Sequence, residues 1–232
     1  MVFIGGVGRS GTHFIARYLQ RHKQTHLRME KPRTFRPITQ LATRGFEDDL
    51  YQKVLRRLKW QKAIHRKLVV EKSHPSIWLA ERLLKDLPNS RFVCTRRPVL
   101  QVVNSMLNHE GVLKWYDVLP LDKENPFLGI SEENVAEFES LPLHLKCTWK
   151  WISHHQRISD CVQAHPANFR VWEFENLVGS PEKSMEDLCD FIGVQPTTFG
   201  ETPDTSSLFK YQNLSELQRS EICALVEEQS LS

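Results

Sequence analysis

A glycine-rich turn near the start of the chain is the first place where residue types and spacing suggest chemistry. Residues 5–13 read GGVGRSGTH, after the apolar run 1–5 and before apolar residues at helical spacing. A strand, a glycine turn and a helix in this order direct backbone N–H groups and a helix N-terminus at a phosphate. The P-loop pattern G-x-x-x-x-G-K-[ST] fits as far as Gly11, but Thr12 and His13 replace its lysine and its magnesium-binding hydroxyl. The turn is therefore predicted to hold an oxyanion, without the groups that hold Mg²⁺ and a triphosphate together.

A second candidate anion site follows the apolar run 91–95. Arg97 stands just beyond that run, and Ser105 lies eight residues later on a helix that Pro98 can begin at its first position. A guanidinium at a strand end and a hydroxyl two turns along a helix can converge on one phosphate dianion. Arg96, nine residues before Ser105, is the alternative to Arg97.

The elements that would position these groups alternate between strands and helices. Short apolar runs predict four buried strands, at residues 1–5, 68–70, 91–95 and 169–172. Helical spacing and capping residues predict helices over 12–22, 48–65, 76–85, 143–162 and 180–191, one from Pro98 and one after 213–215. This alternation predicts an α/β fold with a parallel β-sheet flanked by helices, in a single domain over residues 1–232. The proline- and acid-bearing stretch 110–142 is weakly periodic and is predicted to be a lid or acceptor insertion.

Composition and charge narrow the class of ligand. The 232 residues are 40% apolar and 25% charged, as in an ordinary soluble globular chain. The net charge of +3 conceals an asymmetry, because residues 1–100 hold 22 Lys and Arg against 7 Asp and Glu, whereas residues 101–232 hold 9 against 21. The basic residues do not alternate with aromatic ones, as a nucleic-acid groove would require, and the arginines fall near glycine turns. A small phosphorylated ligand is therefore predicted, and no nucleic acid.

The cysteines and the longest apolar runs indicate the surroundings of the chain. Five cysteines with apolar neighbours and no CxxC pair predict buried free thiols, rather than a zinc site or a disulfide scaffold. No run of about 18 apolar residues is present, so no membrane span is predicted. We expect a cytoplasmic protein, or a catalytic domain separated from an anchor.

The two anion motifs together resemble those of sulfotransferases that use 3′-phosphoadenosine 5′-phosphosulfate (PAPS). In that family the loop on the 5′-phosphosulfate reads like G-G-x-x-R-S-G-T, as residues 5–12 do, and the arginine form is similar to tyrosylprotein and bacterial sulfotransferases. The resemblance implies a P-loop NTPase-like sulfotransferase fold, PAPS as co-substrate and no required metal. It places Arg97 and Ser105 on the 3′-phosphate, although the family has Asp or Asn where Pro98 stands. It assigns the phosphosulfate to Gly8, Arg9, Ser10, Gly11, Thr12 and His13.

The same resemblance implies the groups that carry out the transfer, which needs a base for the acceptor proton and a cation on the leaving oxygen. Lys72 ends the second predicted strand, where ligands gather in a parallel sheet, and resembles the family's E-K-[ST]-P lysine that approaches the bridging oxygen. Glu30 lies 21 residues after Arg9, the offset of the catalytic glutamate in tyrosylprotein sulfotransferases. His74 resembles the base of cytosolic sulfotransferases in K-[TS]-H-x-P, and a neutral imidazole suits that role. Glu30 is the first candidate base and His74 the second.

Residues 206–213 resemble the C-terminal loop that folds over the nucleotide in this family, with Lys210 as a phosphate contact. The predicted reaction moves the sulfuryl group of PAPS to a hydroxyl or amine acceptor and leaves the product 3′-phosphoadenosine 5′-phosphate (PAP). The acceptor could be a small alcohol, a glycan or a peptide. The alternatives are a P-loop kinase or nucleotide hydrolase, and a non-catalytic module that binds PAP.

Overall fold

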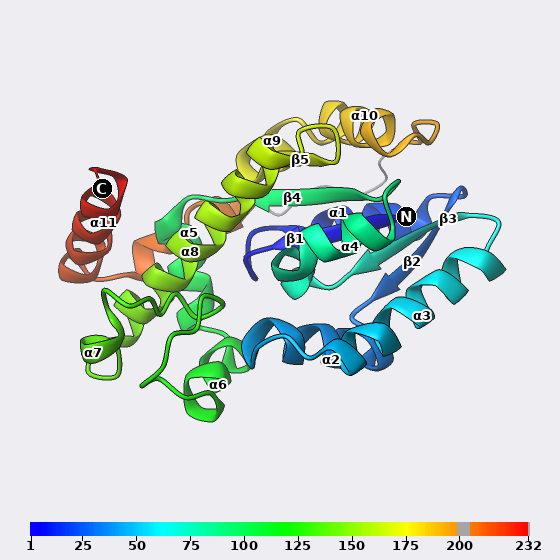
Figure 1. The fold of residues 1–232 in the computed structure, drawn as a ribbon. Coiled ribbons are helices and arrows are strands. Elements are labelled where there is room, and N and C mark those ends of the chain that lie inside the picture. Colours follow the sequence, from blue (N-terminus) through cyan, green and yellow to red (C-terminus); the bar gives the residue numbers. More distant parts are fainter. Residues whose placement is uncertain (199–204, 232) are drawn as a thin grey trace.

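A parallel β-sheet forms the centre of the molecule in the computed structural model, which describes residues 1–198 and 205–231, without the side chains of Ser207, Lys210 and Leu231. The strands follow the order β2-β3-β1-β4-β5, and every neighbouring pair runs parallel (Figure 1). Their bounds are β1 Val2–Gly6, β2 Thr25–Met29, β3 Leu68–Lys72, β4 Arg91–Arg96 and β5 Phe169–Glu173. The register pairs Ile4 with Lys72 and Gly5 with Cys94, so β1 ends between β3 and β4. The predicted α/β architecture is confirmed.

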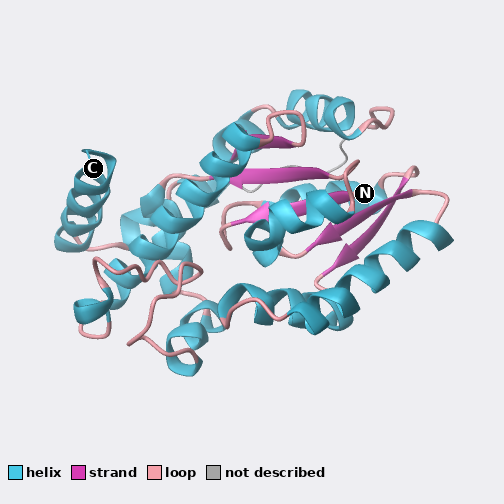
Figure 2. Ribbon diagram, viewed as in Figure 1, coloured by secondary structure: helices cyan, strands magenta, loops and turns pink. Residues whose placement is uncertain are grey.

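Helices cover both faces of this sheet and extend beyond the ends of its strands (Figure 2). The helices of the first half are α1 Thr12–Arg21, α2 Pro32–Thr43, α3 Asp48–Ile64, the 3₁₀-helix η1 His74–Leu79, α4 Ala80–Asp86 and α5 Val99–Leu107. Those of the second half are α6 Glu110–Val118, α7 Val135–Phe138, α8 Leu143–Ala164, α9 Phe174–Gly179, α10 Pro181–Ile192, η2 Thr205–Leu208, η3 Lys210–Asn213 and α11 Glu216–Leu231. Among the described residues, no helix combines the length and the apolar character that crossing a bilayer requires.

Alternation along the strands divides the core between the two faces of the sheet. On one face, Phe3 and Phe92 stack with ring centroids 4.9 Å apart and pack against α3, α4 and α8. On the other face, Val2, Ile4 and Val93 pack against α1 and α10. The three inner strands β3, β1 and β4 are therefore largely buried on both sides, which is why they read as apolar runs in the sequence.

A third apolar cluster joins the stretch 110–142 to α5, α8 and α11. A tight turn organises this stretch, because Asn125 and Ile130 exchange two backbone hydrogen bonds of 2.9 and 3.0 Å. The Asn125 amide donates to the Thr43 carbonyl at the end of α2 (3.0 Å), and Ser153 on α8 donates to the Pro126 carbonyl (2.7 Å). The turn therefore connects α2 with α8 and presents Phe127 between them.

The structure differs from the sequence predictions in several places, and helix α2 over Pro32–Thr43 was not among the predicted elements. Strand β2 was not predicted, because three of its five residues, Thr25, His26 and Arg28, are polar and it lies at the edge of the sheet. The helix predicted over 76–85 begins earlier, as the 3₁₀-helix η1. Cys223 is exposed, whereas the other four cysteines are buried as predicted. The helical turn of α11 directs Ile222 into the core and rotates its neighbour Cys223 toward solvent.

Candidate active site

The glycine turn after β1 has the backbone conformation that an anion-binding loop needs. Gly6, Arg9 and Gly11 all have positive φ, at 126°, 75° and 101°, and α1 begins directly afterwards at Thr12. A Cβ atom on Gly11 would lie 2.5 Å from the ring of Phe174, so glycine is required there by space as well as by conformation. The loop thus delivers the N-terminus of α1 to the carboxyl end of the sheet, where it is suited to an anion.

The side chains of the loop differ in whether their hydrogen-bonding groups are free to contact a ligand. The Ser10 hydroxyl donates to the Val7 carbonyl and accepts from the Thr95 hydroxyl, both at 2.7 Å, so it anchors the loop to β4. The contribution of Ser10 to an anion site is therefore limited to its backbone N–H. Thr12 is buried at the start of α1, and Gly8 lies beside the His74 ring, where a Cβ would come within 3.9 Å of Nε2.

Arg9, Arg97 and Ser105 form one cluster. The Arg9 Nε–H donates to Ser105 Oγ (3.1 Å), and the Arg97 guanidinium donates to the backbone carbonyl of Arg9 (3.1 Å). Arg97 also donates to Gln101 (2.8 Å), and its guanidinium lies 4.2 Å from the centre of the Phe174 ring. The loop motif and the strand-end motif, which are far apart in the sequence, are therefore adjacent and share Arg9.

Arg96 points away from this cluster. Its guanidinium donates to Ser159 Oγ on α8 (2.6 Å), because successive side chains of a strand point to opposite faces of the sheet. Burial lowers the pKa of Arg97 to about 10 and also lowers the pKa of Arg9. Of the two alternatives in the sequence, Arg97 is the one beside the loop.

The three candidate catalytic residues meet at the ends of β2 and β3. Glu30 follows β2 with a left-handed φ of 46°, and its backbone N–H donates to the Lys72 carbonyl (2.9 Å). This turn directs the Glu30 carboxylate at the Lys72 ammonium, and the two form an ion pair. His74 Nδ1 lies 3.8 Å and His13 Nε2 4.0 Å from the same carboxylate oxygen, and His13 Nε2 is 3.4 Å from Lys72 Nζ.

The environment of these four groups fixes their charges at neutral pH. His74 and the ion pair with Lys72 together lower the pKa of Glu30 to about 2. Burial lowers the pKa of His74 to about 4 and also lowers the pKa of His13. Burial lowers the pKa of Lys72 as well, against the opposing effect of Glu30. The site therefore holds one carboxylate, one ammonium and two neutral imidazoles.

A buried network that the sequence analysis missed supports Glu30 and Lys72. Glu71 is fully buried and accepts hydrogen bonds from Arg28 on β2 (3.0 Å), Thr34 on α2 (2.7 Å) and Ser73 (3.1 Å). Its carboxylate thus joins β2, β3 and the first turn of α2 around the site. A signal was present in the sequence, because a carboxylate inside an apolar strand requires a buried partner.

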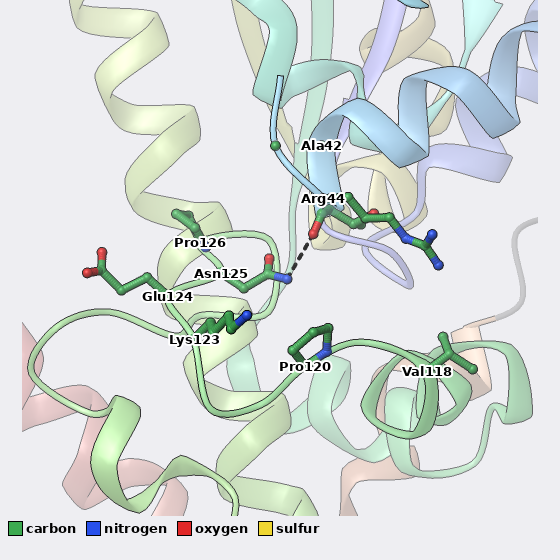
Figure 3. Close-up of a pocket in the computed structure, with 10 residues that line it drawn as sticks. Ala42, Arg44, Val118, Pro120, Lys123, Glu124, Asn125 and Pro126 are labelled. Atoms are coloured by element: carbon green, nitrogen blue, oxygen red, sulfur yellow. Dashed lines mark hydrogen bonds between the residues drawn. The ribbon is translucent and has the colours of Figure 1, made fainter. Parts of the chain in front are cut away.

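A cavity of about 650 Å³ opens between the end of α2 and the segment 118–126 (Figure 3). Arg44 and Lys123 contribute basic side chains to its lining, and Asn125 crosses it to reach α2. Because α2 starts two residues after Glu30 and has 12 residues, the cavity lies roughly 18 Å along that helix from the carboxylate. None of the predicted site residues lines it. The backbone of Lys210 begins η3, whereas its side chain, the predicted phosphate contact, lies outside the described residues.

Comparisons with known proteins identify the family and the fold. Residues 2–198 match the Sulfotransferase family. The fold is similar to a sulfotransferase from Alicyclobacillus acidocaldarius, with 18% identity, a TM-score of 0.59 and coverage of 97% of this chain and 90% of that chain. It is also similar to the sulfotransferase domain of the Synechococcus PCC 7002 olefin synthase, with 14% identity, a TM-score of 0.61 and coverage of 98% and 94%. A third similar structure is the sulfotransferase domain from the curacin biosynthetic pathway, with 16% identity, a TM-score of 0.55 and coverage of 90% and 81%.

No sequence among the curated proteins matches this chain. At such identities the solved structures establish the fold alone, whereas the family match extends over most of the chain. The chain therefore belongs to the sulfotransferase family and is a PAPS-dependent enzyme of sulfuryl transfer.

Proposed function

We propose that this enzyme transfers the sulfuryl group of PAPS to a hydroxyl or amine acceptor by in-line displacement, with Glu30 as general base and Lys72 as the cation on the leaving oxygen. The observation that carries the proposal is the Glu30–Lys72 ion pair at the strand ends beside the phosphate loop. A proton acceptor and a cation held side by side are the two groups that this transfer needs.

The nucleotide is held by the cluster around Arg9. Arg97 and Ser105 bind the 3′-phosphate, and the backbone N–H groups of residues 8–13 bind the 5′-phosphosulfate at the start of α1. The Arg9 guanidinium is the cation of the loop on the 5′-phosphosulfate, and it adjoins the 3′-phosphate site, since its Nε–H contacts Ser105 and its backbone carbonyl contacts Arg97. Every one of these groups is a hydrogen-bond donor or a cation, which matches an anionic ligand.

In the reaction, the acceptor oxygen or nitrogen attacks sulfur, and the bond between sulfur and the bridging oxygen breaks. The acceptor gives its proton to the Glu30 carboxylate, and the electron pair of the broken bond remains on the 5′-phosphate of PAP. Lys72 stabilises the charge that develops on that oxygen. A phosphosulfate in the loop competes with Glu30 for the Lys72 ammonium, and weakening the ion pair makes the carboxylate a stronger base.

Accessibility supports Glu30 over His74 as the base. The Glu30 side chain is 33% exposed, whereas that of His74 is 16% exposed and its Nδ1 faces Glu30. An acceptor can therefore reach Glu30 directly, and His74 lies behind it. His74 remains the alternative base.

The Glu30→Gln variant tests the assignment. It should lower kcat by about 100-fold or more, with the dissociation constant for PAP little changed, because the amide keeps the shape but cannot take the proton. The measurement pairs steady-state turnover of radiolabelled PAPS with calorimetric titration of PAP. His74→Gln is the matched variant, and wild-type turnover in Glu30→Gln together with loss in His74→Gln would transfer the role to His74. Titrations of ATP and GTP, with and without Mg²⁺, test the kinase alternative.

A further inference from the structure

A lysine of α8 is buried behind the candidate active site, and the proposed mechanism does not use it. Lys150 is 2% exposed, and its Nζ has no hydrogen-bond partner among the described residues. The Lys150 ammonium makes a cation–π contact with the ring of Phe127, whose centre lies 3.5 Å from Nζ. Moving an ammonium out of water costs several kcal/mol, and a cation–π contact returns only about 0.5–2 kcal/mol. Packing alone would favour an apolar residue at this position.

The Phe127 ring links Lys150 to the active site. The same ring lies 6.4 Å, centre to centre, from the ring of His74 and 5.3 Å from that of His154. The His74 ring also lies 5.8 Å, centre to centre, from that of Phe35 on α2, and its Nδ1 lies 3.8 Å from the Glu30 carboxylate. Lys150, Phe127, His74 and Glu30 therefore form a continuous series from α8 to the proposed base.

The charged groups around His74 act in opposite directions. Burial is the main cause of the low pKa of His74; Glu30 favours the protonated imidazole, and Lys72 on β3 and Lys150 on α8 lower the pKa further. His154, also on α8, has its own pKa lowered by burial and by Lys150. Burial lowers the pKa of Lys150 to about 7, so this side chain is charged below neutral pH, where an ordinary histidine takes up a proton.

The state of His74 matters for the proposed base. An imidazolium at Nδ1 would be a second cation on the carboxylate that already pairs with Lys72. Two cations would stabilise the ionised carboxylate further and make it a poorer proton acceptor. A neutral ring leaves Glu30 with a single counter-ion, the one that a phosphosulfate can attract away.

We propose that Lys150 is a positioning residue for sulfuryl transfer, which acts through Phe127 and His74 to keep the His74 ring uncharged beside Glu30. This role rests on the proposed function of Glu30, although its physical basis can be measured without turnover. The buried charge of Lys150 is then retained at the expense of stability, because below neutral pH it opposes protonation of the imidazole beside the base.

The test compares Lys150→Met with Lys146→Met, a buried lysine one turn earlier on α8 whose Nζ donates to the Glu139 carbonyl. NMR of histidine-labelled protein follows the titration of each ring, with His74 assigned by its loss in His74→Gln. In Lys150→Met the titration of His74 should move to higher pH, and the midpoint of urea unfolding should rise. In Lys146→Met the His74 titration should stay as in the wild type.

Turnover supplies the functional measurement. In Lys150→Met, a rise of the His74 pKa from about 4 by roughly half to one unit should lower kcat/KM at pH 5 relative to pH 8 by about 1.2- to 2-fold more than in the wild type. PAP binding should not change, and Lys150→Arg, which keeps the charge, should restore the wild-type pH profile. An unchanged His74 titration in Lys150→Met overturns the inference, whatever the activity. Full turnover in Glu30→Gln would instead contradict the proposed base while leaving the His74 titration as a separate result.

Discussion

Removing the buried charge of Glu71 should destabilise the enzyme and slow it for one structural reason. Glu71→Gln keeps the size of the side chain but leaves Arg28, which is 8% exposed, without its counter-ion. Breaking one side of a buried ion pair costs about 3–5 kcal/mol, a large part of the roughly 5–15 kcal/mol that stabilises a typical domain. Burial raises the pKa of Glu71, which shows that desolvation exceeds the favourable effect of its hydrogen bonds. The loss should therefore come mainly from the stranded arginine.

Urea unfolding of three variants measures this effect. Glu71→Gln should lose several kcal/mol, whereas Glu71→Gln combined with Arg28→Met should recover most of that loss, because no unpaired charge remains. Asp187→Asn provides the control, since it breaks the exposed Arg170–Asp187 pair, which should contribute at most about 1 kcal/mol. Turnover at a temperature where Glu71→Gln is folded should be reduced at unchanged PAP affinity, because the network holds Glu30 against Lys72. Equal midpoints for the wild type and Glu71→Gln would refute the reasoning.

Two further changes test the loop and the leaving-group cation. Gly11→Ala should weaken PAP binding and lower the midpoint of urea unfolding, because the new methyl group would lie 2.5 Å from the Phe174 ring at a residue whose φ is 101°. Gly179→Ala is the control, since nothing lies within 4 Å of a Cβ at that position. Normal PAP binding by Gly11→Ala would contradict the argument that this position has no space for a side chain. Lys72→Met should lower kcat by about 100-fold while changing PAP affinity much less, since in the proposed reaction the Lys72 ammonium stabilises charge that develops in the transition state. An equal loss in PAP affinity and in kcat would show that Lys72 binds the nucleotide in the ground state instead.

Residue patterns within single segments were sufficient to predict most strands of the sheet and the phosphate loop. Strands β1, β3 and β4 lie inside the sheet and are largely buried on both faces, so each appears as an apolar run, and the glycines after β1 mark the turn. Strand β5 lies at an edge, but its Phe169, Val171 and Trp172 were enough to predict it. The position of Lys72 beside that turn followed from parallel pairing, because neighbouring parallel strands end at the same edge. That part of the site could be derived from the residues.

Glu30 could be placed only through the family resemblance. Strand β2, which ends beside it, is an edge strand with an intermediate burial pattern, so it has no apolar run to reveal it. The pairing of Arg28 with Glu71 depends on the register between β2 and β3, and the contact of Arg9 with Ser105 joins residues 96 positions apart. Lys150 reads as a surface residue of an amphipathic helix, because the stretch that covers it, with Phe127, comes from a segment without clear periodicity. These features depend on tertiary contacts that no local pattern encodes.

One electrostatic property connects these separate parts of the site. Burial lowers the pKa of Arg9, Arg97 and Lys72, so the folded chain stabilises each of these cations less than water does. In the proposed binding mode, a nucleotide with a 3′-phosphate and a 5′-phosphosulfate would bring negative charge to all three and return the stabilisation that burial removed. The same argument explains the order of events in the proposed reaction. Lys72 binds Glu30 strongly only while no stronger anion competes for it, so the arrival of the donor both positions the leaving group and strengthens the base.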